Sequence, residues 1–130
     1  MCILLLYKMI DLKQCTFIIP VRIESEDRMR NVITVLCYLL ENFDTKVILK
    51  EVDTESVFEK EVLPQIKDYL GDAINNLTHV FEESDDPVFY RMKIINEMLH
   101  MSDTPVIANY DGDVLFKPET YTKAVEMMRK

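Results

Sequence analysis

The chain has 130 residues, of which 23 are acidic and 15 are basic, so its formal net charge is -8. This length predicts one domain with a single core, and the negative charge opposes binding to a polyanionic phosphate backbone, so nucleic acid is not expected as a partner. The three cysteines include no Cys-x-x-Cys pair, which argues against a disulfide framework or a thiolate zinc site and favours a reducing, cytoplasmic setting.

The first 15 residues are predicted to form a leader or an extra strand. Residues 3–7 are apolar, but a membrane-spanning helix needs about 20 apolar residues, and no signal-peptide cleavage pattern follows, so no membrane span is expected. Met9 offers an alternative start, so residues 1–8 are expected to be dispensable. The main domain is therefore assigned to residues 16–130.

Apolar runs of strand length alternate with segments of helical periodicity four times along this domain. In chain order the predicted elements are strand 16–21, helix 25–42, strand 46–49, helix 56–70, strand 77–81, helix 87–101, strand 106–110 and a helix from Pro118 to the end. This alternation predicts an α/β fold, with a Rossmann-like, mostly parallel sheet flanked by helices.

Local residue types set the expected helix boundaries. Ser25 is predicted to be the N-cap of the first helix, and Ser56 with Glu59 resembles a capping box at the start of the second. Pro64 is expected to kink or restart that second helix. Pro87 is expected to open the third, because proline suits the first helical position.

Polar pairs directly follow three of the four predicted strands. They are Arg22 and Glu24 after the first strand, Glu51 and Asp53 after the second, and Asp111 and Asp113 after the fourth. Ligands of parallel sheets bind beyond the carboxyl ends of the strands, so we expect these pairs to meet at one edge of the sheet.

Asp111 and Asp113, separated by Gly112, are the candidate metal ligands. Two carboxylates supply the hard oxygen ligands that Mn²⁺ and Mg²⁺ prefer, and the glycine leaves the backbone unobstructed. Taken alone, a tripeptide this short is more often an ordinary Asp-Gly turn. Its position directly after a buried strand favours a site for Mn²⁺ or Mg²⁺.

These features together resemble the nucleotide-binding half of a GT-A fold, family 2-like glycosyltransferase. Residues 17–21 (Phe-Ile-Ile-Pro-Val) are similar to the strand and proline that open such domains, and residues 111–113 are similar to their DXD motif. Residues 89–96 are similar to the Phe-x-Arg-x-Lys-x-x-Asn helix of galactosyltransferase and chondroitin-polymerase-like enzymes. The resemblance covers residues 16–130, with the three motifs in the family's order.

The resemblance implies a role for each matched residue. The base and ribose would be lined by Pro20, Val21 and Arg22, and the base would be contacted by Glu51 or Asp53. The donor would be oriented near its diphosphate by Arg91 and Lys93. Asp113 would bind the metal directly, and Asp111 would touch the ribose or reach the metal through water.

Some of these roles have alternatives within the fold. The second strand ends in Lys-Glu-Val-Asp where many relatives have Asp-Asp followed by Gly-Ser, so a solvated acidic loop is an equal alternative there. Without the family, Arg91 and Lys93 indicate the exposed face of an amphipathic helix. Asn96 is expected to lie on the apolar stripe between Met92 and Leu99 and to act as a tether to the metal loop.

The reaction implied by the resemblance is transfer of a sugar from a nucleotide sugar, a UDP-sugar, to a carbohydrate acceptor with inversion. Enzymes of this class add an acceptor-binding half after the DXD strand, and no catalytic base can be assigned in this sequence. We therefore expect the donor-binding part of such an enzyme, without turnover by these residues alone.

Two other classes stay open as alternatives. One is a non-catalytic, truncated interaction module that pairs with another chain or forms a homodimer. The other is a sugar nucleotidyltransferase, a class that generally carries a Gly-rich basic loop after its first strand, whereas residues 22–28 contain no glycine. His79 and His100 are expected to be surface or satisfied core histidines, because their spacing indicates no zinc site.

Overall fold

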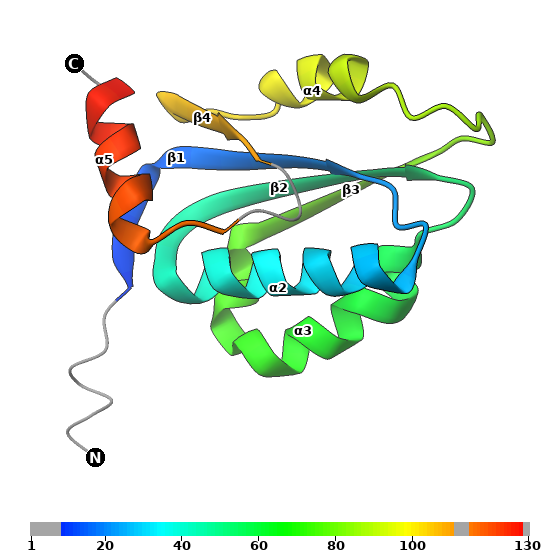
Figure 1. The fold of residues 1–130 in the computed structure, drawn as a ribbon, viewed down its shortest axis with the longest axis horizontal. Coiled ribbons are helices and arrows are strands. Elements are labelled where there is room, and N and C mark those ends of the chain that lie inside the picture. Colours follow the sequence, from blue (N-terminus) through cyan, green and yellow to red (C-terminus); the bar gives the residue numbers. More distant parts are fainter. Residues whose placement is uncertain (1–8, 111–114, 129–130) are drawn as a thin grey trace.

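The computed structural model describes residues 9–110 and 115–128. Figure 1 shows an α/β fold in which helices lie on both faces of one sheet. In chain order the elements are β1 (Ile10–Val21), α2 (Glu26–Asn42), β2 (Phe43–Asp53), a π-helical turn (Phe58–Val62), α3 (Leu63–Leu70), a 3-10 helix (Gly71–Asn76), β3 (Leu77–Glu83), α4 (Arg91–Leu99), β4 (Val106–Asn109) and α5 (Pro118–Met128).

The four described strands are all parallel and lie in the order β3-β2-β1-β4. The predicted Rossmann-like α/β architecture is therefore confirmed. Helices α2 and α3 cover one face of the sheet and α4 covers the other, while α5 lies beside the first part of β1 (Figure 1). Because all four strands run the same way, their carboxyl ends meet at one edge, which is where parallel sheets bind ligands.

Helix α2 forms where the sequence provides a cap and an apolar stripe. Ser25 Oγ accepts a hydrogen bond from Arg28 N at 3.2 Å, which confirms the predicted N-cap. The residues that the helix buries against the sheet share three- and four-residue spacing and are Val32, Val35, Leu36, Leu39 and Leu40.

Strand β1 begins earlier than the sequence predicted. Pairing starts at Ile10, opposite Phe43, and its register shifts before Thr16. Polar, exposed residues dilute the apolar pattern of this stretch, in which only Leu12 and Cys15 are buried. The expected strand boundary at residue 16 was therefore wrong, and the last part of the segment predicted to be a leader or an extra strand belongs to β1. Residues 1–8 lie outside the described residues.

The helical segment after β2 has the predicted break at its proline. It starts as the π-helical turn and restarts as α3 at Leu63, next to Pro64. Proline lacks the backbone N–H that a helix interior needs, so it suits the first turn of the restarted helix. Ser56 Oγ accepts a hydrogen bond from Glu59 N at 3.1 Å, which supplies the serine half of the predicted capping box.

Helix α4 is shorter than predicted and does not start at Pro87. It begins at Arg91, and Ser84 Oγ accepts a hydrogen bond from Asp86 N at 3.2 Å in the loop before it. The carbonyls of Asp86 and Pro87 accept hydrogen bonds from the Arg22 side chain. The predicted helix start was wrong because this tertiary contact takes carbonyls that a first helical turn would use.

The side chains that α4 buries differ from the predicted stripe. Under α4 lies a small core of Ile18, Ile48, Val52, Ile94, Ile95 and Met98. Met92 and Leu99 are exposed. Asn96 is exposed as well, so its predicted place on the apolar stripe was wrong and the tether inferred from it has no basis.

Candidate functional site

The carboxyl edge of the sheet brings the ends of β1 and β2 together. In the parallel register Pro20 lies opposite Lys50 and Val21 opposite Glu51. Both Pro20 and Val21 are buried. Arg22 follows directly and donates from Nε to the carbonyl of Val52, so the end of β1 meets the end of β2 at this edge. Glu51 and Asp53 were predicted to follow the second strand, but they lie within β2 because its pairing with β3 continues to Asp53.

Arg22 is buried, and its guanidinium joins β1 to two other parts of the chain. Nε donates to the carbonyl of Val52 at 2.7 Å, and Nη1 donates to the carbonyls of Asp86 at 3.0 Å and Pro87 at 3.2 Å. The guanidinium carbon lies 5.5 Å from the centroid of the Phe89 ring, a cation–π distance. The side chain thus fixes the loop before α4 against the end of β2.

The charge of Arg22 has no carboxylate counter-ion among the described residues. Its hydrogen bonds go to backbone carbonyls, and its Nη2 is buried with no hydrogen-bond partner among the described residues. Buried cations are usually paired, because an uncompensated buried charge is costly. A ligand acceptor near Nη2 would therefore be stabilising, and it could reach this nitrogen only if the enclosing residues shift.

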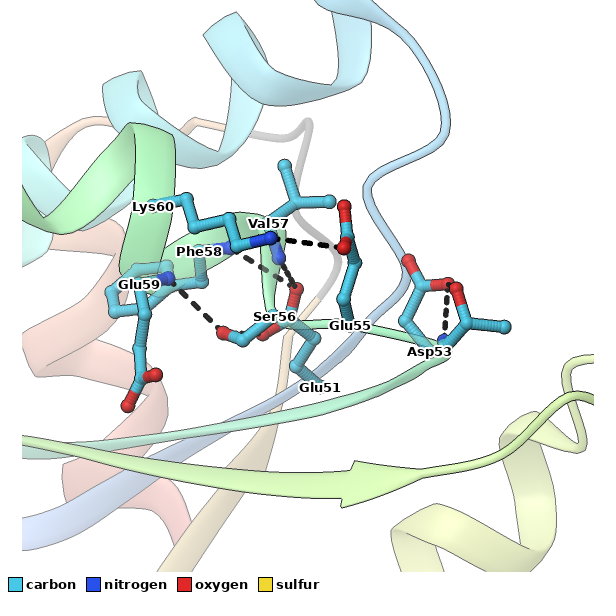
Figure 2. Close-up of polar contacts among 9 residues, drawn as sticks. Glu51, Asp53, Glu55, Ser56, Val57, Phe58, Glu59 and Lys60 are labelled. Carbon is cyan, nitrogen blue, oxygen red and sulfur yellow. Dashed lines mark hydrogen bonds and ion pairs between the residues drawn. The ribbon is translucent and has the colours of Figure 1, made fainter.

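The Glu51 carboxylate caps the helical segment that follows β2 (Figure 2). Oε1 accepts a hydrogen bond from the Ser56 hydroxyl at 2.6 Å, and Oε2 accepts from the backbone N–H groups of Val57 at 2.9 Å and Phe58 at 3.1 Å. Oε1 also lies 3.1 Å from His79 Nε2. The side chain is fully buried. Burial disfavours its charged form, but the hydrogen bonds from His79, Ser56 and Phe58 outweigh burial and lower the pKa of Glu51.

The two alternatives for the base contact on the second strand are therefore placed differently. Both oxygens of Glu51 are engaged inside the protein, whereas Asp53 is only partly buried. Asp53 Oδ1 accepts a hydrogen bond from Thr54 N at 2.7 Å. Asp53 is the better placed of the two to meet a ligand.

His79 belongs to the Glu51 network, which the sequence analysis missed. Its ring also packs against Phe58, with a centroid separation of 4.5 Å. This position agrees with the expectation of a satisfied histidine rather than a metal ligand. The sequence did contain a signal for this network: Glu51 lies at the end of an apolar strand, five residues before the capping Ser56.

Lys50 is a second polar residue that the sequence analysis did not single out. Its Nζ lies 3.1 Å from Glu82 Oε1 on β3 and 3.0 Å from Glu97 Oε1 on α4, and its side chain is almost fully buried. Burial disfavours the ammonium form, but the hydrogen bonds and charges of Glu97 and Glu82 outweigh burial and raise the pKa of Lys50. The ammonium therefore holds α4, and with it Arg91, over the sheet.

Arg91 opens α4 close to the end of β4. Its Nη2 donates to Asn109 Oδ1 at 3.4 Å, and the residue is half-buried. Lys93 is exposed on the same helix. The structure thus places Arg91 beside the strand that leads to the predicted metal pair, through an asparagine that was not predicted.

Asp111 and Asp113 themselves lie outside the described residues. Within residues 9–110 and 115–128, no group of three or more His, Cys, Asp and Glu side chains could hold a metal ion. The metal hypothesis therefore depends on the chemistry of the pair, whose two carboxylates suit Mn²⁺ or Mg²⁺.

The chain matches no protein-family model, no curated protein and no solved structure. The resemblance to glycosyltransferases thus rests on its sequence motifs. Across the described ranges, no helix has both the length and the hydropathy that crossing a bilayer requires.

Proposed function

We propose that this chain is the donor-binding part of a metal-dependent GT-A glycosyltransferase, which transfers a sugar from a UDP-sugar to a carbohydrate acceptor. The observation that carries the proposal is Arg22, a buried guanidinium at the carboxyl edge with one donor nitrogen that no described residue satisfies. Parallel sheets bind ligands at this edge, and a carbonyl or anionic oxygen of a nucleotide would supply the missing acceptor.

The other residues at this edge have chemistry that suits a nucleotide. Pro20 and Val21 offer apolar contact, and Asp53 offers a carboxylate that can accept a hydrogen bond from the base. Arg91 and Lys93 place positive charge on α4, which favours a diphosphate. Arg22 additionally holds the loop before α4 in place through its carbonyl contacts.

The predicted cofactor would be held by Asp111 and Asp113. When bound, Mn²⁺ or Mg²⁺ neutralises the charge that develops on a leaving nucleoside diphosphate. Arg91 adds positive charge from the protein, because its guanidinium lies against Asn109 at the end of β4.

Thermal unfolding with UDP, with Mn²⁺ and with both tests the proposal. A ligand that binds only the folded state stabilises it by about 2.7 kcal/mol at 100 times its dissociation constant, which raises Tm by several degrees. We expect this shift only when UDP and Mn²⁺ are present together, and we expect Asp113→Ala to abolish it.

The matched control is Asp103→Ala. Asp103 is an exposed aspartate that pairs with Lys46 at 3.0 Å, near the amino ends of the strands. This variant should keep the shift with UDP and Mn²⁺. The proposal fails if the unsubstituted protein shows no shift at millimolar ligand, or if Asp113→Ala retains it.

A non-catalytic interaction module is a second candidate, favoured by exposed apolar side chains near the end of the described chain. Leu115, Phe116, Met127 and Met128 are 43%, 52%, 70% and 73% exposed. Met128 also lines an apolar groove of about 240 Å³ between β4, β1 and α5, and β4 is an edge strand of the described sheet. A dimer in sedimentation equilibrium with no metal-dependent effect of UDP would favour this candidate, whereas a monomer would argue against it.

A further inference from the structure

A pocket of about 450 Å³ lies on the α4 face of the sheet, toward the amino ends of the strands. Its floor includes Thr16 on β1, Ile48 on β2 and Val80 on β3. Its walls come from residues 75–76, at the end of the 3-10 helix, and from residues 101–103, after α4. Sites for small ligands commonly have volumes of about 300–1,000 Å³, so this pocket is large enough for a small ligand.

Hydroxyl groups hold the wall that follows α4 against the sheet. Thr104 Oγ1 donates to the Val106 carbonyl at 2.9 Å, and it lies 2.7 Å from Thr16 Oγ1 and 3.0 Å from Ser102 Oγ. Because a hydroxyl has one hydrogen, Thr104 must accept from the other two side chains. This network fixes the wall to β1, so binding of a ligand would cost little ordering of the protein.

The charged groups that line the pocket among the described residues are one lysine and one aspartate. Lys46 Nζ lies 3.0 Å from Asp103 Oδ1. The hydrogen bond from Lys46 lowers the pKa of Asp103, so both groups are charged at neutral pH. Their charges cancel, which leaves no excess positive charge to attract a phosphate or another anion. A neutral ligand therefore suits the pocket best.

The other polar groups on the opposite wall can both donate and accept hydrogen bonds. They are the amides of Asn75 and Asn76 and the hydroxyl of Thr78. Asn75 and Thr78 are exposed and Asn76 is half-buried, so a ligand can reach them. Met101, which is 40% exposed, adds apolar surface beside them. No aromatic side chain of the described chain lines the pocket, which disfavours a stacked nucleobase.

We propose that this pocket binds one ring of a neutral saccharide. Sugar hydroxyls both donate and accept hydrogen bonds, as the asparagine amides and the threonine hydroxyl do, and the C–H groups of the ring match the apolar floor. The pocket lies toward the amino ends of the strands, whereas the proposed donor site lies at their carboxyl edge. The inference goes beyond the proposed function and does not depend on it, because it requires neither a nucleotide nor a metal.

The test is an NMR titration of the full ¹⁵N-labelled chain with glucose, galactose, N-acetylglucosamine and N-acetylgalactosamine at millimolar concentrations. We expect at least one of these sugars to cause saturable shifts of the backbone amides of residues 75–80 and 101–104. Asn76→Ala removes one amide and Thr78→Val removes one hydroxyl. Each should weaken the affinity about fivefold, the change that corresponds to one net hydrogen bond.

Asn31→Ala is the matched control, because Asn31 is an exposed asparagine on α2 and does not line the pocket. It should leave the affinity unchanged. Cyclohexanol, a ring with a single hydroxyl, should not cause the shifts. Absence of saturable shifts with all the sugars, equal shifts with cyclohexanol, or unchanged affinity in both Asn76→Ala and Thr78→Val would overturn the inference. These outcomes leave the thermal shift with UDP and Mn²⁺ unaffected, so the two proposals fail separately.

Discussion

Replacing Glu51 with glutamine should destabilise the fold, because its carboxylate receives four contacts from the protein. The substitution preserves the size of the side chain but removes the negative charge. The amide oxygen can still accept from the N–H groups of Val57 and Phe58. The amide nitrogen must then face Ser56 and His79, which would have to accept rather than donate.

The expected loss follows from the difference between charged and neutral hydrogen bonds. Bonds to a charged group contribute about 1.5–3 kcal/mol and neutral ones about 0.5–1.5 kcal/mol. The contacts from Val57 and Phe58 should each weaken by about 1 kcal/mol on this scale. The reversed contacts with Ser56 and His79 add a smaller cost, so we expect Glu51→Gln to lower the free energy of unfolding by about 2–3 kcal/mol, a large part of the total for a small domain.

Urea unfolding followed by far-UV circular dichroism measures this loss. The folded-state pKa of Glu51 is lowered from 4.5, so the carboxylate stabilises the fold above about pH 4.5 and loses this effect as pH falls through the lowered pKa. The difference between the unsubstituted protein and Glu51→Gln should therefore be constant near neutral pH and shrink in acid.

Glu55→Gln is the control for a nearby glutamate. Glu55 pairs with Lys60 at 2.9 Å, but both side chains are largely exposed, so its removal should change stability by less than about 1 kcal/mol. Equal stability of Glu51→Gln and the unsubstituted protein at neutral pH would refute the capping role. A difference that does not change with pH would refute the role of the charge.

Three further predictions follow from the described contacts. Lys50→Met should loosen the packing of α4 on the sheet, because it removes the ammonium that binds Glu82 and Glu97. Relative to the unsubstituted protein, amide hydrogen exchange should become faster in α4 and change less in α2, and unchanged exchange in α4 would contradict this prediction. Ser25→Ala should cost about 1 kcal/mol through loss of the α2 N-cap, measured by urea unfolding, whereas Ser25→Gly should cost less. Cys15 is buried, and burial raises its pKa to about 11. Its thiol should therefore resist alkylation in the folded protein at neutral pH. Rapid labelling of Cys15, detected by mass spectrometry, would count against the buried position.

The sequence predicted the strand–helix order well because burial needs a simple repeated pattern. Short, continuous apolar runs indicated strands buried between two layers of helices. In α2 the three- and four-residue spacing of the apolar residues matched the single stripe that the helix buries. In α4 the same reasoning failed, because two different sets of residues have helical spacing. One set is residues 92, 96 and 99, and the other is residues 94, 95 and 98. Only the position of the helix over Ile18 and Ile48 decides which stripe is buried.

The ends of elements were predicted less well, since contacts between distant segments determine them. Pro87 has the local properties of a helix start, but Arg22, far away in the chain, takes its carbonyl. Polar residues at the start of β1 concealed a strand that forms because Ile10 pairs with Phe43.

The sequence alone therefore determined the fold class and the edge at which Arg22, Glu51 and Asp53 converge, because strand direction in such a chain sets where the ends of neighbouring strands meet. Tertiary structure decided what each of these side chains does there. It enclosed Arg22 without a counter-ion and turned Glu51 into a helix cap with His79. The physical reason is that hydrogen bonding and burial depend on neighbours distant in sequence, which periodicity cannot encode.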